Sequence, residues 1–309
     1  MFPPTGGTHR RSDVLPSVSV IIPTLNEGAN LPHVLPRLPS FVTEVIIVDG
    51  DSTDDTVEVA RRLRPDVRIV RQVGRGKGTA LRQGFASATG QIIVSIDADG
   101  STKPEEIANF VDALLDGAEY VKGSRFLRGG GSSDLTVLRR AGNLGLTVLV
   151  RVLHGPHFTD LCYGYNAFWA HVLPSLHLRS TGFEIETEMN LRAHHAGLRI
   201  VEVPSQELDR IHGESHLRTF PDGWRVLKTI LRERVRRTPA VTAPIRIPVG
   251  VPVEAESVAI VVDGEAATMA EGGDPVARPV AVEVMVMDPA PRIGGKVDPE
   301  EEQLLAGVS

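Results

Sequence analysis

Two aspartates, Asp97 and Asp99, flank a single alanine directly after an apolar stretch that is typical of a buried strand. Because Ala98 is small, both carboxylates can leave the edge of a sheet close together with room for a ligand. Two neighbouring carboxylates attract a hard divalent cation such as Mg²⁺ or Mn²⁺, which would bridge two phosphates and neutralise charge on a departing nucleotide diphosphate. An isolated pair of this kind more often caps the following helix, so the surrounding sequence has to decide.

A second acidic cluster follows the strand expected at 44–48. Asp49 closes this strand, and Asp51 stands in a run of acidic and hydroxyl side chains, residues 51–56, that begins a helix. An acidic side chain at this position can bind the ribose or the base of a nucleotide. By itself the run is equally typical of a helix cap. The interpretation as a nucleotide site depends on the presence of the 97–99 pair at the end of another strand.

A glycine-rich turn at 74–78 opens another helix. Its free backbone amides, together with Arg75 and Lys77, are suited to contact phosphate. The turn lacks the spacing of a Walker loop, and the first strand leads into 23–27 (PTLNE) rather than into the glycine pattern of dinucleotide-binding proteins. The sequence therefore argues against a P-loop enzyme and against a Rossmann oxidoreductase.

Short β-branched runs alternate with helical patterns in the first half, as expected of β-α-β units. Repeated units of this kind predict an α/β fold with a mostly parallel central sheet flanked by helices. Ligands of such sheets bind outside the carboxyl ends of the strands, where the acidic pair and the two other motifs stand. We expect strands at 18–22, 44–48, 67–70, 91–96 and 119–122, and helices at 30–38, 54–63, 78–88 and from Pro104 onward.

The second half of the chain carries elements that would shape an acceptor site. A glycine-rich loop at 129–131 precedes a long apolar helix at 136–153, and a further α/β stretch continues to Pro204. Residues 218–237 hold 7 basic and 2 acidic residues, with apolar residues at roughly helical spacing. This pattern predicts a basic amphipathic helix that either packs on the core or lies on an anionic membrane. The side chains expected at lipid phosphates are Arg225, Lys228, Arg232 and Arg236.

The two ends of the chain differ in composition from the middle. We interpret residues 1–16 as a flexible leader and residues 238–309 as a low-complexity, mostly disordered tail, with short strands at 257–262 and 280–286 left open. The tail holds 12 acidic and 4 basic residues, whereas the first 237 residues hold 27 and 29, so the net charge of -6 belongs to the tail. One domain is expected over 17–237.

Cysteine content and hydropathy limit the class of protein. Cys162 is the single cysteine, which excludes an internal disulfide framework. No apolar run reaches the roughly 18 residues of a membrane-spanning helix, and no secretory signal pattern is visible. We therefore expect a cytoplasmic protein, soluble or peripheral on the inner face of the membrane. The group of His154, His157, Asp160 and Cys162 fits no tetrahedral zinc spacing, and no nucleic-acid recognition motif accompanies the basic helix.

Taken in order, four segments resemble the family 2 glycosyltransferases of the GT-A fold. They are residues 21–27 (IIPTLNE), 48–54 (VDGDSTD), 76–78 (GKG) and 97–99 (DAD). Within that family the chain is similar to the dolichol-phosphate (polyprenyl-phosphate) mannosyltransferase branch. The segments that carry this closer similarity are 123–126 (GSRF), 202–204 (EVP) and 210–215 (RIHGES). The resemblance covers roughly residues 17–232.

This resemblance implies an inverting, metal-dependent hexosyltransferase. It implies a divalent metal, Mg²⁺ or Mn²⁺, at Asp97 and Asp99. It also implies an acceptor phosphate held by Arg125, Arg139 and Arg210, whose guanidinium groups suit bidentate binding of phosphate; an ordinary surface role is the alternative for all three. The donor nucleotide is expected at Pro23, Leu25, Asn26, Glu27 and Asp49, with Asp51, Lys77 and Asp97 beside them.

The sequence departs from this branch at two places near these residues. Gly100 and Ser101 stand where the branch often has a glutamine two residues after the second aspartate, so metal coordination is expected to be looser. His216 replaces the usual lysine of a G-x-S-K pattern and would hold phosphate less firmly. An ionised phosphate oxygen needs little base, whereas a sugar hydroxyl needs a carboxylate such as Asp99 or Asp160. The acceptor therefore stays open.

The expected reaction is the transfer of mannose or glucose from GDP-mannose or UDP-glucose to a polyprenyl-phosphate lipid. A soluble phosphorylated small acid or a glycan hydroxyl is the first alternative acceptor. A second alternative is nucleotidyl transfer to a sugar phosphate, which would release pyrophosphate instead of a nucleoside diphosphate. A third is a protein that binds nucleotide sugars without turnover.

Overall fold

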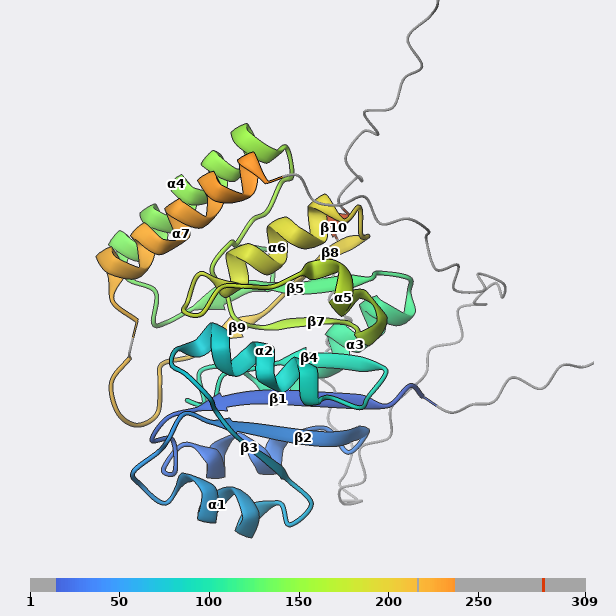
Figure 1. The fold of residues 1–309 in the computed structure, drawn as a ribbon, viewed down its shortest axis with the longest axis vertical. Coiled ribbons are helices and arrows are strands. Elements are labelled where there is room, and N and C mark those ends of the chain that lie inside the picture. The colour runs from blue at the N-terminus through green and yellow to red at the C-terminus, as the bar shows by residue number, and fades with distance from the viewer. Residues whose placement is uncertain (1–14, 216, 237–284, 287–309) are drawn as a thin grey trace, which may run out of the picture.

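A computed structural model describes residues 15–215, 217–236 and 285–286 of the chain (Figure 1). The centre of these residues is an eight-stranded sheet with the strand order β10-β8-β5-β7-β4-β1-β2-β3. β1 pairs in parallel with β2 and with β4, as does β2 with β3 and β5 with β8. β7 and β10 run antiparallel to their neighbours, so the sheet is mostly parallel, as predicted. The strands are β1 (Val18–Thr24), β2 (Val42–Asp49), β3 (Arg68–Arg71), β4 (Ile92–Ser95), β5 (Tyr120–Ser124), β7 (Asn166–Trp169), β8 (Ile200–Pro204) and β10 (Met285–Val286).

Helices cover both faces of this sheet (Figure 1). Side chains alternate along β1, so that Val18, Val20 and Ile22 pack in one core with α1 and α3, whereas Ile21 packs in a second core with α2 and α6. The α-helices are α1 (Thr56–Leu63), α2 (Lys77–Ser87), α3 (Ile107–Leu115), α4 (Val137–His154), α5 (Leu173–Leu176), α6 (Ile185–His195) and α7 (Thr219–Val235). The 3₁₀ turns are η1 (Leu31–His33), η2 (Leu35–Arg37), η3 (Pro104–Glu106) and η4 (Ala170–Val172).

The segment 30–38 differs from the predicted helix. It forms the two 3₁₀ turns η1 and η2, each with a proline near its start. Pro32 and Pro36 lack the backbone N–H that an α-helix interior needs, and their rings clash with the preceding turn. The other predicted helices and strands are confirmed, with ends that shift by at most two residues, although Pro104 begins a 3₁₀ turn that leads into α3.

Two further features bear on the site and on the ends of the chain. A small parallel pair, β6 (Gly131–Ser132) and β9 (Gln206–Glu207), lies outside the main sheet.

The predicted leader 1–16 and tail 238–309 lie outside the described residues, except for residues 15–16 and the short strand β10, so the domain limits stay a prediction. Within the described ranges, no helix has both the length and the apolar character required to cross a bilayer.

Candidate active site

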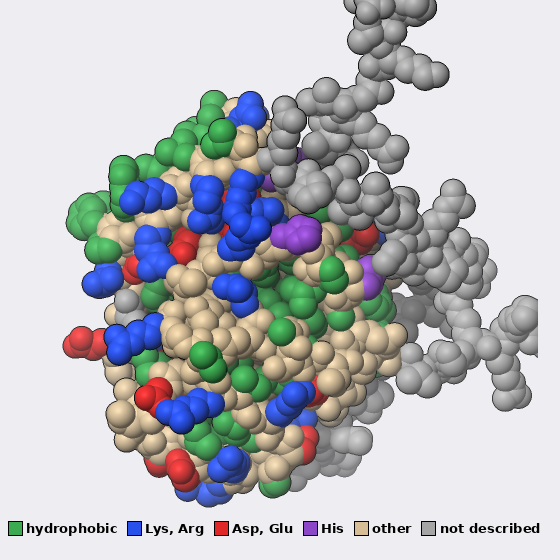
Figure 2. All heavy atoms as spheres, viewed as in Figure 1, with side chains coloured by type: hydrophobic (Ala, Val, Ile, Leu, Met, Phe, Trp, Pro, Cys, Tyr) green, Lys and Arg blue, Asp and Glu red, His purple; other side chains and the backbone are tan. Residues whose placement is uncertain are grey.

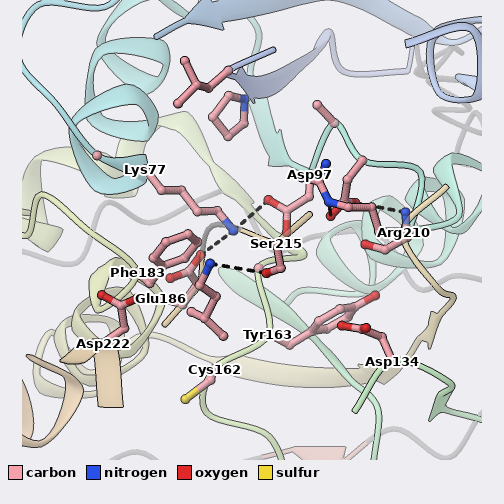
Figure 3. Close-up of a pocket in the computed structure, with 18 of the residues that line it drawn as sticks. Lys77, Asp97, Asp134, Cys162, Tyr163, Phe183, Glu186, Arg210, Ser215 and Asp222 are labelled. Carbon is pink, nitrogen blue, oxygen red and sulfur yellow. Dashed lines mark hydrogen bonds and ion pairs between the residues drawn. The ribbon is translucent and has the colours of Figure 1, made fainter. Parts of the chain in front are cut away.

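The carboxyl ends of β1, β2 and β4 open into a cavity of about 1180 Å³ (Figure 3). Its opposite side comes from α4, α6 and α7. This is the position at which open parallel sheets bind ligands. Asn26, Asp49 and Asp160 do not line the cavity. The predicted site residues that do are Pro23, Leu25, Glu27, Asp51, Lys77, Asp97, Asp99, Arg125, Arg139 and Arg210.

Lys77 joins three of the elements around the cavity. It is the first residue of α2, and its Nζ atom lies 2.7 Å from Oδ1 of Asp97 and 2.9 Å from Oε1 of Glu186 in α6 (Figure 3). Burial by itself lowers the pKa of the Lys77 amine, but the two carboxylates outweigh burial and raise that pKa. For Glu186 burial dominates and raises the pKa despite the lysine. The cavity therefore holds a fixed positive charge beside the aspartate pair.

Asp99 is held in place from a second side. Its Oδ1 atom accepts a hydrogen bond of 3.0 Å from the backbone N–H of Ser101, and its Oδ2 atom lies 3.6 Å from Nε of Arg210. Arg210 is itself paired with Glu27 at 2.6 Å. Burial raises the pKa of Glu27, although the hydrogen bond from Asn30 and the charge of Arg210 oppose the rise. Each aspartate of the pair thus faces one basic side chain.

Asp97 and Asp99 fit the requirements of a hard divalent cation. Their side chains keep 29% and 22% of their surface exposed, so each can offer an oxygen to a ligand in the cavity. In the part of the chain that the structure describes, no cluster of three or more His, Cys, Asp or Glu side chains is arranged to hold a metal. A cation would take these two carboxylates and complete its shell with phosphate and water oxygens, which is a common mode for Mg²⁺.

Asn26 and Asp49 shape the loops that follow β1 and β2. Asn26 has a positive φ of 57°, and its side-chain oxygen accepts the N–H of Thr53 at 2.8 Å. The Ser52 hydroxyl accepts the N–H of Asn26 at 2.9 Å and donates to Asp49 at 2.6 Å. These bonds tie the two loops together at the end of the cavity formed by β1 and β2. Direct contact of Asn26 or Asp49 with a nucleotide stays a prediction.

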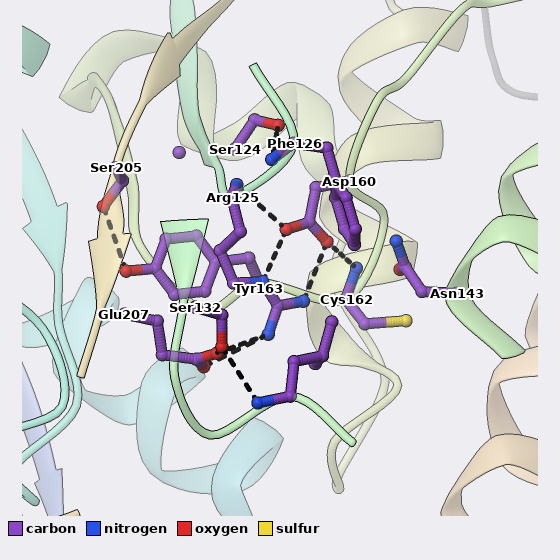
Figure 4. Close-up of polar contacts among 12 residues, drawn as sticks. Ser124, Arg125, Phe126, Ser132, Asn143, Asp160, Cys162, Tyr163, Ser205 and Glu207 are labelled. Atoms are coloured by element: carbon purple, nitrogen blue, oxygen red, sulfur yellow. Dashed lines mark hydrogen bonds and ion pairs between the residues drawn. The ribbon is translucent and has the colours of Figure 1, made fainter. Parts of the chain in front are cut away.

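Arg125 is enclosed by two carboxylates and an aromatic ring (Figure 4). Its Nε and Nη2 atoms contact Asp160 at 2.6 and 2.9 Å, Nη1 contacts Glu207 at 3.0 Å, and the guanidinium lies 4.9 Å from the centre of the Tyr163 ring. Burial would raise the pKa of Asp160, but Arg125 holds that pKa below its usual range. Asp160 is fully buried, so its predicted role as a base stays a prediction and its contacts indicate a positioning role.

Arg139 is the least engaged of the three arginines predicted to bind phosphate. It stands in the first turn of α4, and its guanidinium lies 3.6 Å from Asp134 and 3.5 Å from the carbonyl oxygen of Leu217. Arg125 and Arg210 each make ion pairs at 2.6 Å. Arg139 can therefore turn to an anionic ligand with the smallest loss of existing interactions.

The glycine-rich turn at 74–78 serves close packing. Gly76 has a φ of +93°, and a Cβ atom there would lie 2.3 Å from the carbonyl oxygen of Thr181. At Gly78 a Cβ atom would lie 2.6 Å from the carbonyl oxygen of Ser180. The two glycines let the start of α2 approach the loop before α6, and this approach brings Lys77, which stands between them, to α6.

The sequence analysis missed Glu186 and Glu207, the two cavity carboxylates that pair with Lys77 and Arg125. Glu186 belongs to a run, 184–188, in which acids alternate with Ile and Thr, and every residue of that run is buried. Buried acids inside a helix are unusual without partners, so this run carried a usable signal. The sequence around Glu207 contained no such signal, because its partner Arg125 is 82 positions away.

An apolar surface lies beside the cavity. α4 and α7 run side by side and project beyond one end of the sheet (Figure 1), and hydrophobic side chains gather along this edge in Figure 2. The exposed large ones are Val137, Leu138, Leu144, Val148 and Val152 on α4 and Phe220, Trp224, Leu231 and Val235 on α7. We call this set the α4–α7 face.

The arginines of α7 that were predicted at lipid phosphates contact carboxylates of α6 and α7. Lys228 differs from them, because within the described residues no ion pair joins it to a carboxylate, and its Nζ atom lies 5.5 Å from the centre of the Trp224 ring. Ion pairs therefore neutralise part of the basic charge that the sequence pattern indicated for this helix. The arginine pairs are Arg225–Glu184 (2.9 Å), Arg232–Glu188 (3.5 Å) and Arg236–Glu233 (3.2 Å).

Comparison with known proteins gives consistent similarities. Residues 19–173 match the sequence profile of the family described as Glycosyl transferase family 2. An undecaprenyl-phosphate mannosyltransferase of Micrococcus luteus is 32% identical over 212 residues, which are 65% of this chain and 87% of that protein. Glycosyltransferase AglJ of Haloferax volcanii is 30% identical over 229 residues, 72% of this chain and 74% of that protein.

Two further similarities concern a longer relative and a solved structure. A dolichol-phosphate mannosyltransferase of Pyrococcus furiosus is 31% identical over 211 residues, which are 65% of this chain but only 59% of that protein. The solved structure is glucosyl-3-phosphoglycerate synthase from Mycobacterium tuberculosis in complex with Mn²⁺, UDP and phosphoglyceric acid. It has a TM-score of 0.56 and 25% identity, and the match covers 74% of this chain and 85% of that chain.

Proposed function

This chain belongs to glycosyltransferase family 2, and we propose that it transfers a hexose from a nucleotide-diphosphate sugar to a polyprenyl-phosphate type of lipid, with inversion at the anomeric carbon. It is a glycosyltransferase with the GT-A fold. Relatives named for undecaprenyl-phosphate and dolichol-phosphate mannosyl transfer support the hexose and the lipid acceptor. GDP-mannose and UDP-glucose are the donors of choice, and UDP is bound in the solved neighbour.

One observation carries the acceptor class: the cavity is continuous with the α4–α7 face. Leu138 and Phe220 are exposed on that face and also line the cavity. The same cavity contains Asp97 and Asp99 at its polar side. A water-soluble donor and an acceptor with a long apolar tail would need this combination, because the tail can stay on the apolar surface while the phosphate reaches the donor.

We assign the donor diphosphate to the polar side of the cavity. A divalent cation, Mg²⁺ or Mn²⁺, bound by Asp97 and Asp99 would supply a Lewis acid that neutralises charge on the leaving diphosphate, and Mn²⁺ in the solved neighbour supports this choice. Lys77 supplies a second positive charge at the same place. The other donor-side residues that line the cavity are Pro23, Leu25, Glu27 and Asp51.

We assign the acceptor phosphate first to Arg139, whose existing contacts are the longest of the three arginines. An ionised phosphate oxygen is already a nucleophile, so transfer to it needs little base. Arg125 and Arg210 then hold the cavity wall through their carboxylate partners, and Asp160 orients Arg125. Asp99 remains the candidate base for an acceptor with a hydroxyl nucleophile.

We place the protein on the cytoplasmic face of the membrane, in peripheral contact with anionic lipid through residues 218–237 and the outer side of α4. Apolar side chains of a surface helix enter the boundary between headgroups and acyl chains. Val148 and Trp224 on the α4–α7 face are exposed in this way. Lys228 and Arg234 are exposed basic side chains of α7 outside the carboxylate pairs described above, and they can meet lipid phosphates.

The decisive experiment offers the full chain labelled GDP-mannose or UDP-glucose with Mn²⁺ or Mg²⁺, with and without a polyprenyl phosphate. Label that enters the organic phase only when both metal and lipid are present supports the proposal. Absence of transfer from either donor under these conditions overturns it. The released nucleotide should be a nucleoside diphosphate. Nucleotidyl transfer would be detected instead in a separate incubation with a nucleoside triphosphate and hexose 1-phosphate, which would release pyrophosphate.

A soluble phosphorylated small acid is the second candidate acceptor. The similarity to the solved glucosyl-3-phosphoglycerate synthase, which is bound to phosphoglyceric acid, supports it. The same assay with 3-phosphoglycerate in place of the lipid separates the two candidates. Label that remains in a water-soluble product, together with none in the organic phase, would favour this second function.

A further inference from the structure

Lys77 is the cation that Asp97 contacts in this structure, and we infer that Lys77 is a resident counter-ion which a divalent metal displaces from Asp97. The inference rests on the proposed use of a metal at Asp97 and Asp99. The Nζ atom lies 2.7 Å from Oδ1 of Asp97, which is the distance of a charge-assisted hydrogen bond. A dication on the same carboxylate would stand within a few ångströms of the ammonium group and repel it. Metal and lysine therefore compete for Asp97.

Glu186 gives the displaced lysine a second anchor. Its Oε1 atom lies 2.9 Å from the same Nζ atom, and its side chain is almost fully buried. Among the described residues, Lys77 is the basic side chain that forms an ion pair with Glu186. When Asp97 turns to a metal, Lys77 keeps Glu186 and its charge stays in the cavity. Glu186 is therefore a positioning residue for Lys77.

The surroundings restrict the exchange to the end of the lysine side chain. Gly76 and Gly78 fix the backbone on either side of Lys77 against the loop before α6. The ring of Phe183 lies 5.8 Å from Nζ on another side. The flexible four-carbon stem can thus shift the ammonium group from Asp97 toward Glu186 or toward a bound diphosphate, while the start of α2 stays in place.

Mn²⁺ binding to the full chain without nucleotide tests the inference, with free Mn²⁺ followed by its electron paramagnetic resonance signal. Lys77→Met should lower the Mn²⁺ Kd by about tenfold or more, a conservative value for removal of a unit charge at this range. Glu186→Gln should raise the Kd, because Lys77 then has Asp97 alone. The double variant should return to the Kd of Lys77→Met, which is the coupling expected of residues that act in one chain.

Arg75→Met is the matched control. Arg75 also lines the cavity, but in the described part of the chain no ion pair joins it to Asp97 or Asp99. Equal Mn²⁺ affinity of Lys77→Met, Arg75→Met and the wild type would overturn this inference but not the proposed function. If the wild type binds no Mn²⁺, even with UDP or GDP present, the metal part of the proposed function falls as well. If Lys77→Met does not fold, the double variant replaces it in the test, because it removes the buried Glu186 charge together with its partner and is expected to have the same Mn²⁺ Kd.

Discussion

Arg125 and Asp160 form a two-pronged ion pair inside the protein, with 2.6 Å between Nε and Oδ2 and 2.9 Å between Nη2 and Oδ1. The neighbouring Thr159 donates its N–H and its hydroxyl to Glu202 of β8, at 2.9 and 2.8 Å. The loop that carries Asp160 is therefore fixed to the sheet from two sides. A carboxylate committed in this way sets the shape of the cavity wall more readily than it accepts a proton from a substrate.

Replacing Asp160 with asparagine should therefore lower the free energy of unfolding, and we expect any loss of turnover to follow from this change in structure. Loss of one partner leaves the buried charge of Arg125 poorly compensated, which costs about 3 kcal/mol of unfolding free energy. Denaturant unfolding of the full chain measures this loss. In Asp134→Asn the broken contact to Arg139 is long and partly exposed, so the change should stay below about 1 kcal/mol. Unchanged stability of Asp160→Asn with lost turnover would support a base instead.

Asp97→Asn and Asp99→Asn should each remove most of the transferase activity. If the pair holds the metal, turnover should fall by at least about 100-fold, which corresponds to about 2.7 kcal/mol of activation free energy. Stability should change little in Asp99→Asn, whose contact to Arg210 is long. It should fall more in Asp97→Asn, which leaves the ammonium group of Lys77 paired with Glu186 alone. Initial rates with saturating Mn²⁺ test this, with the exposed Asp66→Asn as control. Wild-type turnover in both variants would rule out a metal role for the pair.

Three histidines meet where α4, α6 and α7 come together. Nδ1 of His154 lies 3.1 Å from Nε2 of His195, and Nε2 of His194 lies 3.2 Å from the carbonyl oxygen of His154. Burial, followed by repulsion from His154 and His194 and then from Arg192 and Arg234, lowers the pKa of His195 from 6.5 to about 4. Burial also lowers the pKa of His154 and of His194. The folded state therefore prefers these rings neutral.

This preference predicts acid sensitivity. The stabilisation is fully present above pH 6.5, the ordinary value, and is lost as the pH falls from there toward the folded-state pKa of His195, about 4. The midpoint of urea unfolding should therefore drop between pH 7 and pH 5. His195→Gln should make that drop smaller, whereas His171→Gln, on the exposed His171, should leave it unchanged. The same drop in His195→Gln as in the wild type would contradict this account.

The α4–α7 face should decide vesicle binding. Val148→Ser and Trp224→Ser each remove an exposed apolar side chain, and each should lower the partition coefficient onto vesicles with anionic lipid, by about tenfold for the tryptophan. Leu115→Ser changes an exposed apolar residue of α3 and should have no effect. Arg225→Ala should weaken folding more than binding, because Arg225 pairs with Glu184. Wild-type partition of the double serine variant would exclude this face as the membrane contact.

Short-range patterns in the sequence determined most of the elements and the polar side of the site. The β-branched runs of β1, β2 and β4 and the acids at their carboxyl ends identified the edge at which Asp97 and Asp99 stand. Periodicity, turn chemistry and capping act over a few residues, so one segment contains the information that predicts them. Pro32 and Pro36 were also a local signal, and they argued against an α-helix at 30–38. The helix prediction was wrong because it followed the apolar spacing of this segment instead.

Only the tertiary structure decided which charges neutralise one another. Glu186 and Glu207 complete the ion pairs of Lys77 and Arg125 from distant parts of the chain. Arg225 and Arg232 pair with Glu184 and Glu188 because α7 packs on α6, and they keep 43% and 44% of their side-chain surface exposed. Such pairings depend on which elements the folded sheet places side by side, and a pattern within one segment does not contain that relation. The polar side of the cavity was therefore predictable from the sequence, whereas the balance of charge inside it followed from packing.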